Sequence, residues 1–203
     1  MLSMALFTFT YHRLITHETL WSFILSSSYL ISIFIIDTSL YVFNSTKIEK
    51  FNSYIRNTYS VIVYSFCYAI TIEFWLILSC GLLFGKNPFS DTKKISTGRL
   101  LESLYLHLGI TIIMILDLFF SERKVDLNKK NLKIINFIFM CYSVVVLITN
   151  YVLIAPAYPF MKDASATLIV AVFVLSFAIL NGSYFIHIFL IRKINKTENK
   201  KLN

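Results

Sequence analysis

The chain contains long stretches of apolar residues, and most of its charged residues lie between these stretches. A helix needs about 20 mainly apolar residues to cross a bilayer. Stretches of this length permit spanning with some tilt. Five of them qualify, at residues 20–43, 58–84, 100–120, 133–155 and 165–191.

The apolar stretches favour helices over strands, because a membrane barrel would need alternating segments of about ten residues. Helices also satisfy their own backbone polar groups where water is absent. A soluble domain of 203 residues could not hide a chain that is 57% apolar and 15% charged in one core. With five glycines and three prolines, collagen-like and low-complexity structures are excluded. The sequence therefore predicts an all-α, polytopic transmembrane helix bundle.

Residues 1–15 form a sixth, shorter apolar stretch that His12 and Arg13 interrupt. This stretch lacks the basic start and small-residue cleavage site of a signal peptide. It is either a short first span or an interfacial helix, and we favour the span. The expected architecture is then five long spans plus a short amino-terminal span, six in total. Residues 1–191 would form one transmembrane domain, and residues 192–203 a basic cytosolic tail.

The basic residues are distributed unequally between the two sides of this predicted bundle. The predicted loop 44–57, the predicted loop 121–132 with Lys133 at its edge, and the tail 192–203 share one side. They carry thirteen lysines and arginines, whereas the opposite side carries six. The positive-inside rule places the thirteen in the cytosol. A glycan at Asn44, which begins an Asn-Ser-Thr pattern, would contradict this orientation.

Lys200 and Lys201 stand at the fourth and third positions from the carboxyl end. On a cytosolic tail this is the arrangement of a dilysine retrieval signal, which a receptor reads. The alternative is an ordinary solvated lysine-rich tail. We expect an endoplasmic reticulum or other endomembrane location.

Several chemistries are not expected from this sequence. The net charge of +8 lies beside apolar stretches rather than on one basic face, so no nucleic-acid partner is expected. The cysteines, Cys67, Cys80 and Cys141, lie inside apolar stretches without metal-ligand or redox spacing. We therefore expect no metal site and no cofactor, and the partners are the lipid bilayer and a lipid substrate.

Polar groups inside a span are costly, so each is a functional hypothesis. Four candidates lie near span ends, where they can reach the interface: Asp37, Glu102, Asp117 and His187. Glu73 is mid-span, and the sequence does not indicate its partner. His107 lies about two turns inside its helix, and Ser103 and Thr111 share its face. This face should point into the bundle, with His107 either catalytic or a structural histidine bonded across helices. The candidates are Asp37, Glu73, Glu102, His107, Asp117 and His187.

A second polar cluster, Ser26-Ser27-Ser28, lies in the first long span. Ser22 and Ser26 are four residues apart, a spacing at which small residues let helices pack closely. Ser26 lies six residues inside its span and His107 seven, so both sit about 10 Å below one surface. A serine hydroxyl and a histidine at matching depth could meet, which makes Ser26 a candidate nucleophile.

The chain resembles the androgen-induced protein and androgen-dependent TFPI-regulating protein family over nearly its whole length. These are multi-span proteins of internal membranes, and some hydrolyse fatty acid esters of hydroxy fatty acids. The family has a catalytic histidine followed ten positions later by an acidic residue. The matching segments are Leu106-His107 to Leu116-Asp117, Tyr158-Pro159-Phe160-Met161, Phe74-Trp75 and Trp21-Ser22-Phe23-Ile24.

The main departure concerns the family's nucleophilic threonine. Counted from Trp21 without a gap, its position falls on Leu25, and a shift of one residue puts it on Ser26. Histidines that some members carry before Tyr-Pro-Phe are Asn150 and Tyr151 here.

The resemblance and the residues together predict an intramembrane lipid-ester hydrolase, with His107 as general base for the Ser26 hydroxyl. Trp21, Trp75, Tyr158 and Phe160 would line the substrate pocket, or anchor the protein at the interface. The chief alternative is a non-catalytic scaffold or lipid-binding relative. A transporter comes third, because no pair of broken helices repeats. The exact substrate and the oligomeric state are left open.

Overall fold

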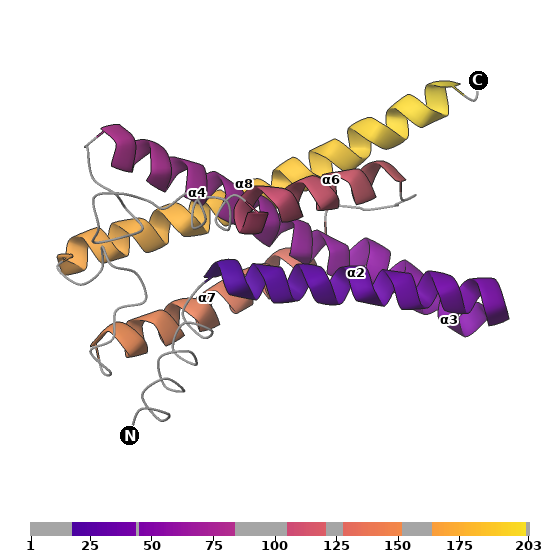
Figure 1. Ribbon diagram of the computed structural model, residues 1–203, viewed down its shortest axis with the longest axis horizontal. Coiled ribbons are helices and arrows are strands. Elements are labelled where there is room, and N and C mark those ends of the chain that lie inside the picture. Colours follow the sequence, from indigo (N-terminus) through magenta and orange to yellow (C-terminus); the bar gives the residue numbers. More distant parts are fainter. Residues whose placement is uncertain (1–17, 44, 84–104, 121–127, 152–163, 202–203) are drawn as a thin grey trace.

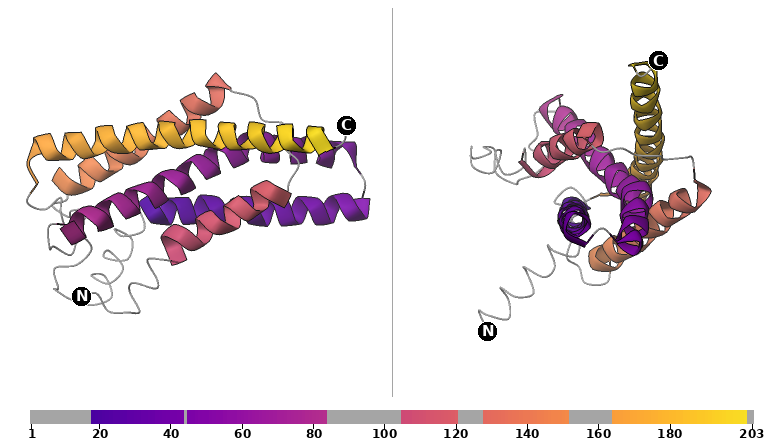
Figure 2. Two further views of the ribbon diagram at one scale, coloured as in Figure 1. Left: turned by 90° about the horizontal axis from the view of Figure 1, so that it is seen from above. Right: turned by 90° about the vertical axis from the view of Figure 1, so that its right-hand side faces the viewer.

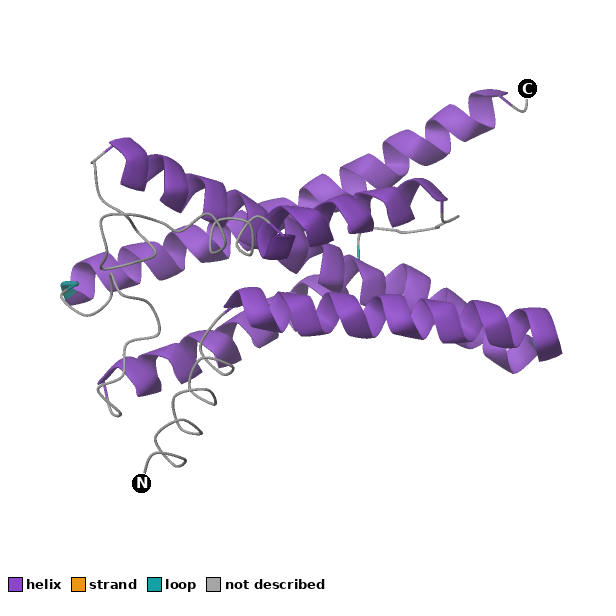
Figure 3. Ribbon diagram, viewed as in Figure 1, coloured by secondary structure: helices purple, strands orange, loops and turns teal. Residues whose placement is uncertain are grey.

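The computed structural model describes residues 18–43, 45–83, 105–120, 128–151 and 164–201, and regular structure within them is entirely helical (Figure 3). Residues 1–15, where a first span is predicted, lie outside these described residues. Two π-helical turns, η1 and η2, precede α4 and α6. The elements in chain order are α2 (Glu18–Phe43), α3 (Thr46–Tyr54), η1 (Ile55–Tyr59), α4 (Ser60–Leu83), η2 (Tyr105–Gly109), α6 (Ile110–Phe120), α7 (Lys129–Tyr151) and α8 (Ala166–Lys201).

Four helices in the described part of the chain are long and apolar enough to cross a membrane. A shorter apolar helix, His107–Phe119, lies within the predicted span 100–120. The helical, multi-pass membrane architecture is therefore confirmed, whereas the full count of six spans stays a prediction. The four long candidates are Trp21–Phe43, Thr46–Leu76, Lys129–Tyr151 and Ala166–Ile194.

The segment 44–57 was expected to be a loop because it is polar and basic, and this expectation is wrong. Helix α3 starts at Thr46 and continues through η1 into α4. The first helical bond runs from the Glu49 N–H to the Ser45 carbonyl at 3.0 Å. The segment contains no glycine or proline to end a helix. Its charges therefore mark where the helix leaves the hydrocarbon layer, and not where the helix ends.

Helix α4 occupies the centre of the bundle and packs against α2, α6, α7 and α8 (Figures 1 and 2). All residues from Ser60 to Ile70 are buried. A helix that is apolar on every side is stable only when other helices surround it. The apolar sequence of α4 thus fixes its central position.

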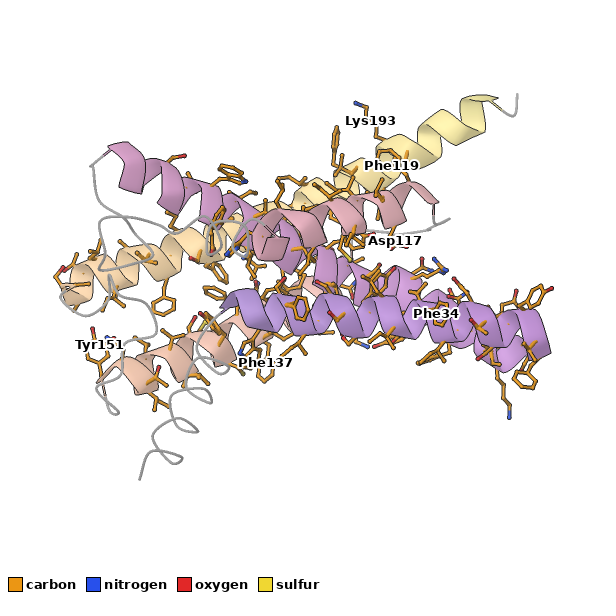
Figure 4. The ribbon with its side chains drawn as sticks, in the orientation of Figure 1. Phe34, Asp117, Phe119, Phe137, Tyr151 and Lys193 are labelled. Atoms are coloured by element: carbon orange, nitrogen blue, oxygen red, sulfur yellow. The ribbon has the colours of Figure 1, made fainter. Side chains whose placement is uncertain are left out.

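The surrounding helices expose large apolar side chains on their outer faces. Phe34 of α2 is 74% exposed and Phe137 of α7 is 69% exposed (Figure 4). Phe189 of α8 is similarly exposed. Apolar surface this extensive is typical of contact with lipid rather than water.

Overpacking of α4 should destabilise the bundle. Ala69 is fully buried on α4, so Ala69→Leu forces larger groups into close-packed space and should cost about 1–3 kcal/mol. The check is the unfolding midpoint of the purified protein in detergent. Val144→Leu, on the exposed face of α7, is the control and should leave the midpoint unchanged. Equal midpoints for Ala69→Leu and wild type would contradict the central placement of α4.

Candidate functional site

Ser26 lies where α2 packs against α4. Its side chain is 1% exposed, and its hydroxyl donates to the Ser22 carbonyl at 2.7 Å. The same Oγ lies 3.0 Å from the Sγ of Cys67, and Ser22 Oγ lies 3.6 Å from that sulfur. Cys67 is a buried free thiol. The two serines thus place small polar groups on either side of one sulfur, and this lets the two helices approach closely.

His107 lies on η2, and its half-buried ring packs against α4. The imidazole stacks on Phe74 with centroids 4.2 Å apart and planes inclined by 15°. Among the described residues, none hydrogen-bonds to His107 Nδ1, although this atom is buried. The ring is therefore positioned by the aromatic face of Phe74.

Two threonines connect the His107 segment to α4. Thr71 of α4 donates a hydroxyl hydrogen bond to the His107 carbonyl. The Thr71 and Thr111 hydroxyl oxygens are 2.6 Å apart, and Thr111 also donates to the Cys67 carbonyl at 3.3 Å. The expectation that the His107–Thr111 face points into the bundle is confirmed, since Thr111 is buried. Ser103, the third member of that face, lies outside the described residues.

Ser26 and His107 contact one face of α4 from two different helices. Their partners on α4, Cys67, Thr71 and Phe74, are spaced by four and three residues, so they lie on the same side of the helix. Cys67 and Thr71 are four residues apart, which separates their levels along α4 by about 6 Å. The structure thus brings the two predicted residues to one side of one helix. The Ser26 hydroxyl lies at Cys67, whereas the His107 ring lies at Phe74, seven residues and about 10 Å further along α4.

The predicted aromatic lining residues have different surroundings. Trp21 of α2 packs edge-to-face on Tyr142 of α7, with centroids 6.2 Å apart. Trp75 of α4 is 42% exposed and contacts Phe74 edge-to-face. Tyr158 and Phe160 lie outside the described residues. Trp75 therefore faces outward from the bundle, although it is the sequence neighbour of the ring that holds His107.

Asp117 of α6 accepts hydrogen bonds from tyrosines on two other helices. The hydroxyls of Tyr29 on α2 and Tyr64 on α4 both lie 2.9 Å from its Oδ2. Tyr64 OH is also 2.5 Å from the Met114 carbonyl. Asp117 was expected to reach the membrane interface by itself. Instead its carboxylate joins α2, α4 and α6, and Figure 4 labels it on the inner side of α6.

His187 of α8 extends this polar group. Its side chain is fully buried, so the expectation that it reaches the interface is wrong. The imidazole stacks on Tyr64, with centroids 4.4 Å apart and planes inclined by 26°. The ring of Tyr68, one turn further along α4, lies with its centroid 6.1 Å from that of the imidazole. Four helices therefore meet at a cluster formed by Tyr29, Tyr64, Asp117 and His187, which we term the tyrosine–aspartate cluster.

Sequence reasoning named Asp117 and His187 but did not identify this cluster. Both tyrosines lie in apolar stretches, where an amphipathic aromatic residue is unremarkable by composition. Their common partner, Asp117, is 88 residues from Tyr29 and 53 residues from Tyr64 in the chain, so no local spacing indicates the contacts. A carboxylate within a membrane span requires hydroxyl or cationic partners, and this requirement is the signal that the sequence offers.

The described residues contain no group of three or more His, Cys, Asp or Glu side chains placed to hold a metal ion. A family model described as FAR-17a/AIG1-like protein matches residues 14–192. The chain belongs to the FAR-17a/AIG1-like family. This is the androgen-induced family that the sequence resembles, so that resemblance is confirmed. Comparison with curated proteins and with solved structures gave no match.

Membership of the FAR-17a/AIG1-like family agrees with the observed architecture. The matched segment covers all four long apolar helices up to residue 192. It also includes Ser26, His107 and the tyrosine–aspartate cluster. The chain is therefore a membrane protein of this family, and its candidate site lies within the matched region.

Removal of one tyrosine hydroxyl from the tyrosine–aspartate cluster should destabilise the protein. Tyr64→Phe deletes a hydroxyl close to both Asp117 and Met114, and the loss should cost about 1–2 kcal/mol. The unfolding midpoint in detergent is the measurement. Tyr151→Phe, at an exposed position on α7, is the matched control and should have no effect. If the two variants were equally stable, the hydrogen bonds to Asp117 would not hold the helices together.

Proposed function

We propose that this protein is an intramembrane hydrolase of lipid esters, with fatty acid esters of hydroxy fatty acids as the substrate class. Family membership supports the proposal, since the resemblance carries this activity with it. The observation that supports it best is that Ser26 and His107 lie against one face of α4. The substrate would already reside among the surrounding acyl chains.

In the proposed reaction, Ser26 Oγ attacks the ester carbonyl while His107 accepts the hydroxyl proton. Attack forms a tetrahedral intermediate, which collapses to a seryl ester as the bond between the carbonyl carbon and the oxygen of the leaving hydroxy fatty acid breaks. His107 returns its proton to that leaving oxygen. Water then attacks the seryl ester, again with His107 as base, and this step releases the fatty acid and restores the serine.

The proposed chemistry requires two local movements. The Ser26 hydroxyl bonds to the Ser22 carbonyl and must release it, which a rotation about the serine χ1 bond achieves. The His107 ring stacks on Phe74, two turns along α4 from Cys67, so it must move by about 10 Å along this helix to reach the hydroxyl. Substrate that wedges between α2 and η2 would drive both movements.

A second candidate function is that of a non-catalytic scaffold or lipid-binding relative. The observation that favours it is the burial of Ser26, whose hydroxyl is fully engaged by Ser22 and Cys67. In this case Ser22 and Ser26 serve only to bring α2 close to α4. The two candidates differ in whether the serine oxygen ever becomes acylated.

Single substitutions should distinguish the two candidates. The purified protein, reconstituted in lipid, should hydrolyse a hydroxy-fatty-acid ester, and Ser26→Ala and His107→Ala should each reduce kcat by at least about 100-fold. Release of the free fatty acid is the measured quantity. Ser143→Ala is the matched control, because Ser143 is also a buried serine bonded to a backbone carbonyl one turn earlier, but on α7.

Three outcomes would decide against the proposal or its residues. Full activity of Ser26→Ala would exclude Ser26 as the nucleophile. Equal losses for Ser26→Ala and Ser143→Ala would indicate general damage to the bundle. A wild-type protein that is folded yet inert toward several lipid esters would favour the scaffold.

The proposed topology has six spans, of which the first lies within residues 1–15. The transmembrane domain would comprise residues 1–191 and lie in the membrane of the endoplasmic reticulum or another endomembrane, and residues 192–203 would form a cytosolic tail. Support for this orientation comes from the excess of lysine and arginine in segments 44–57, 121–133 and 192–203. Helix α8 continues past the apolar segment to Lys201, so the basic tail begins as part of a helix.

Location should depend on the two lysines near the carboxyl end. Replacing both Lys200 and Lys201 by serine removes the receptor-read address, so the full-length protein should leave the reticulum for later compartments. Microscopy against compartment markers is the measurement. Serine at Lys193 and Lys196 removes the same charge and is the control. Retention of the Lys200/Lys201 variant would show that these lysines carry no address.

A further inference from the structure

An ion pair between α2 and η1 marks one boundary of the hydrocarbon layer. Arg56 Nη2 donates to both carboxylate oxygens of Asp37, at 2.9 and 2.7 Å. The Asp37 side chain is 49% exposed, and the Arg56 side chain 17%. A carboxylate this exposed cannot lie among acyl chains without great cost, so it lies at the level of the lipid headgroups. Span residues of α2 precede Asp37, and those of α4 follow Arg56.

Beyond this ion pair, α2 and α3 form a helical hairpin. Helix α2 continues from Thr38 to Phe43, and α3 returns from Thr46 to Tyr54. Figure 1 and the left view of Figure 2 both show this hairpin at the end of the bundle where the carboxyl terminus lies. Six residues of α2 extend about 9 Å. A headgroup layer is about 5–7 Å deep on each side of the hydrocarbon, so the hairpin passes through that layer to its surface.

The hairpin exposes large apolar and aromatic side chains as well as charge. Tyr41 is 92% exposed and Phe43 is 70% exposed at the end of α2. Phe51 and Tyr54 are exposed on α3, beside exposed Lys47 and Lys50. In bulk water this surface would be unfavourable. At a bilayer interface the aromatic rings bury themselves among headgroups, and the lysines reach phosphates.

We propose that the α2–α3 hairpin is a binding surface for acidic phospholipid headgroups in the leaflet at this end of the bundle. The aromatic side chains would hold the hairpin in the headgroup layer. Lys47 and Lys50 would contact the headgroup phosphates and carboxylates. This surface lies beyond the ion pair of Asp37 and Arg56, so it is distinct from the site of Ser26 and His107 and independent of the hydrolase proposal.

Charge at this end of the bundle selects acidic lipids over zwitterionic ones. Arg56 is neutralised by Asp37, which leaves Lys47 and Lys50 against Glu49 on α3. Further cations at the same predicted side are Lys129, Lys130 and Lys133 at the start of α7 and Arg192 and Lys193 on α8. Each lysine near an anionic surface strengthens the attraction, which falls off within a Debye length. The α3 lysines are the cations that lie beside exposed aromatic rings.

The test compares lipids directly around the full-length protein. Wild-type protein is reconstituted in phosphatidylcholine vesicles that contain a trace of spin-labelled phosphatidylserine or spin-labelled phosphatidylcholine. The motionally restricted fraction gives the relative affinity of the protein for each lipid. Wild type should prefer the serine lipid, and the paired substitution K47Q/K50Q should lower this preference about two- to fivefold. Added salt should weaken the preference of the wild type.

The control uses the opposite charge on the same helix. Glu49→Gln removes the acidic residue between the two lysines and should raise the preference for phosphatidylserine, whereas damage to the hairpin would lower it. Equal restriction of both lipids by wild type would overturn the proposal. A preference that K47Q/K50Q leaves unchanged would assign it to other basic residues and overturn the role of the hairpin.

Discussion

Close packing around α4 is the interaction on which the other described helices depend. Within lipid, apolar contact with a neighbouring helix has little advantage over contact with acyl chains, so helices associate through shape and buried polar bonds. Helix α4 supplies both: small residues such as Ala69, and hydroxyl or thiol groups such as Cys67, Thr71 and Tyr64. Helices α2 and α6 bond to these groups, and α8 stacks His187 on Tyr64. Both the candidate site and the tyrosine–aspartate cluster therefore lie on the surface of one helix.

The sequence predicts the fold class well, because segment hydropathy is a local property. The long apolar stretches become helices, and the family resemblance holds over most of the chain. The basic segment 44–57 is the informative error: charge indicated where the chain leaves lipid, but it carried no information on whether the helix stops. Helix continuation depends on backbone propensity, and no glycine or proline lies between Thr46 and Tyr59 to end the helix.

The site was only partly predictable, because its contacts connect residues far apart in the chain. Matching depth placed Ser26 and His107 near each other in principle, and both do contact α4. Depth gives no rotation about the helix axis, so it could not reveal that Cys67 lies between Ser26 and Thr111. For the same reason Asp117 was assigned to the interface, although tyrosines from two other helices bind it.

The π-helical turn that contains His107 has a geometric consequence. Its hydrogen bonds close from residue i to i+5 instead of i+4, so this turn holds one more residue than the α-helix that follows. The side chains within the turn, that of His107 among them, therefore point in a different direction from the one that the periodicity of α6 would give them. A single-residue deletion within Tyr105–Gly109 would restore the regular winding and swing the imidazole away from Phe74. At this point the number of residues, as much as their identity, determines which way the histidine points.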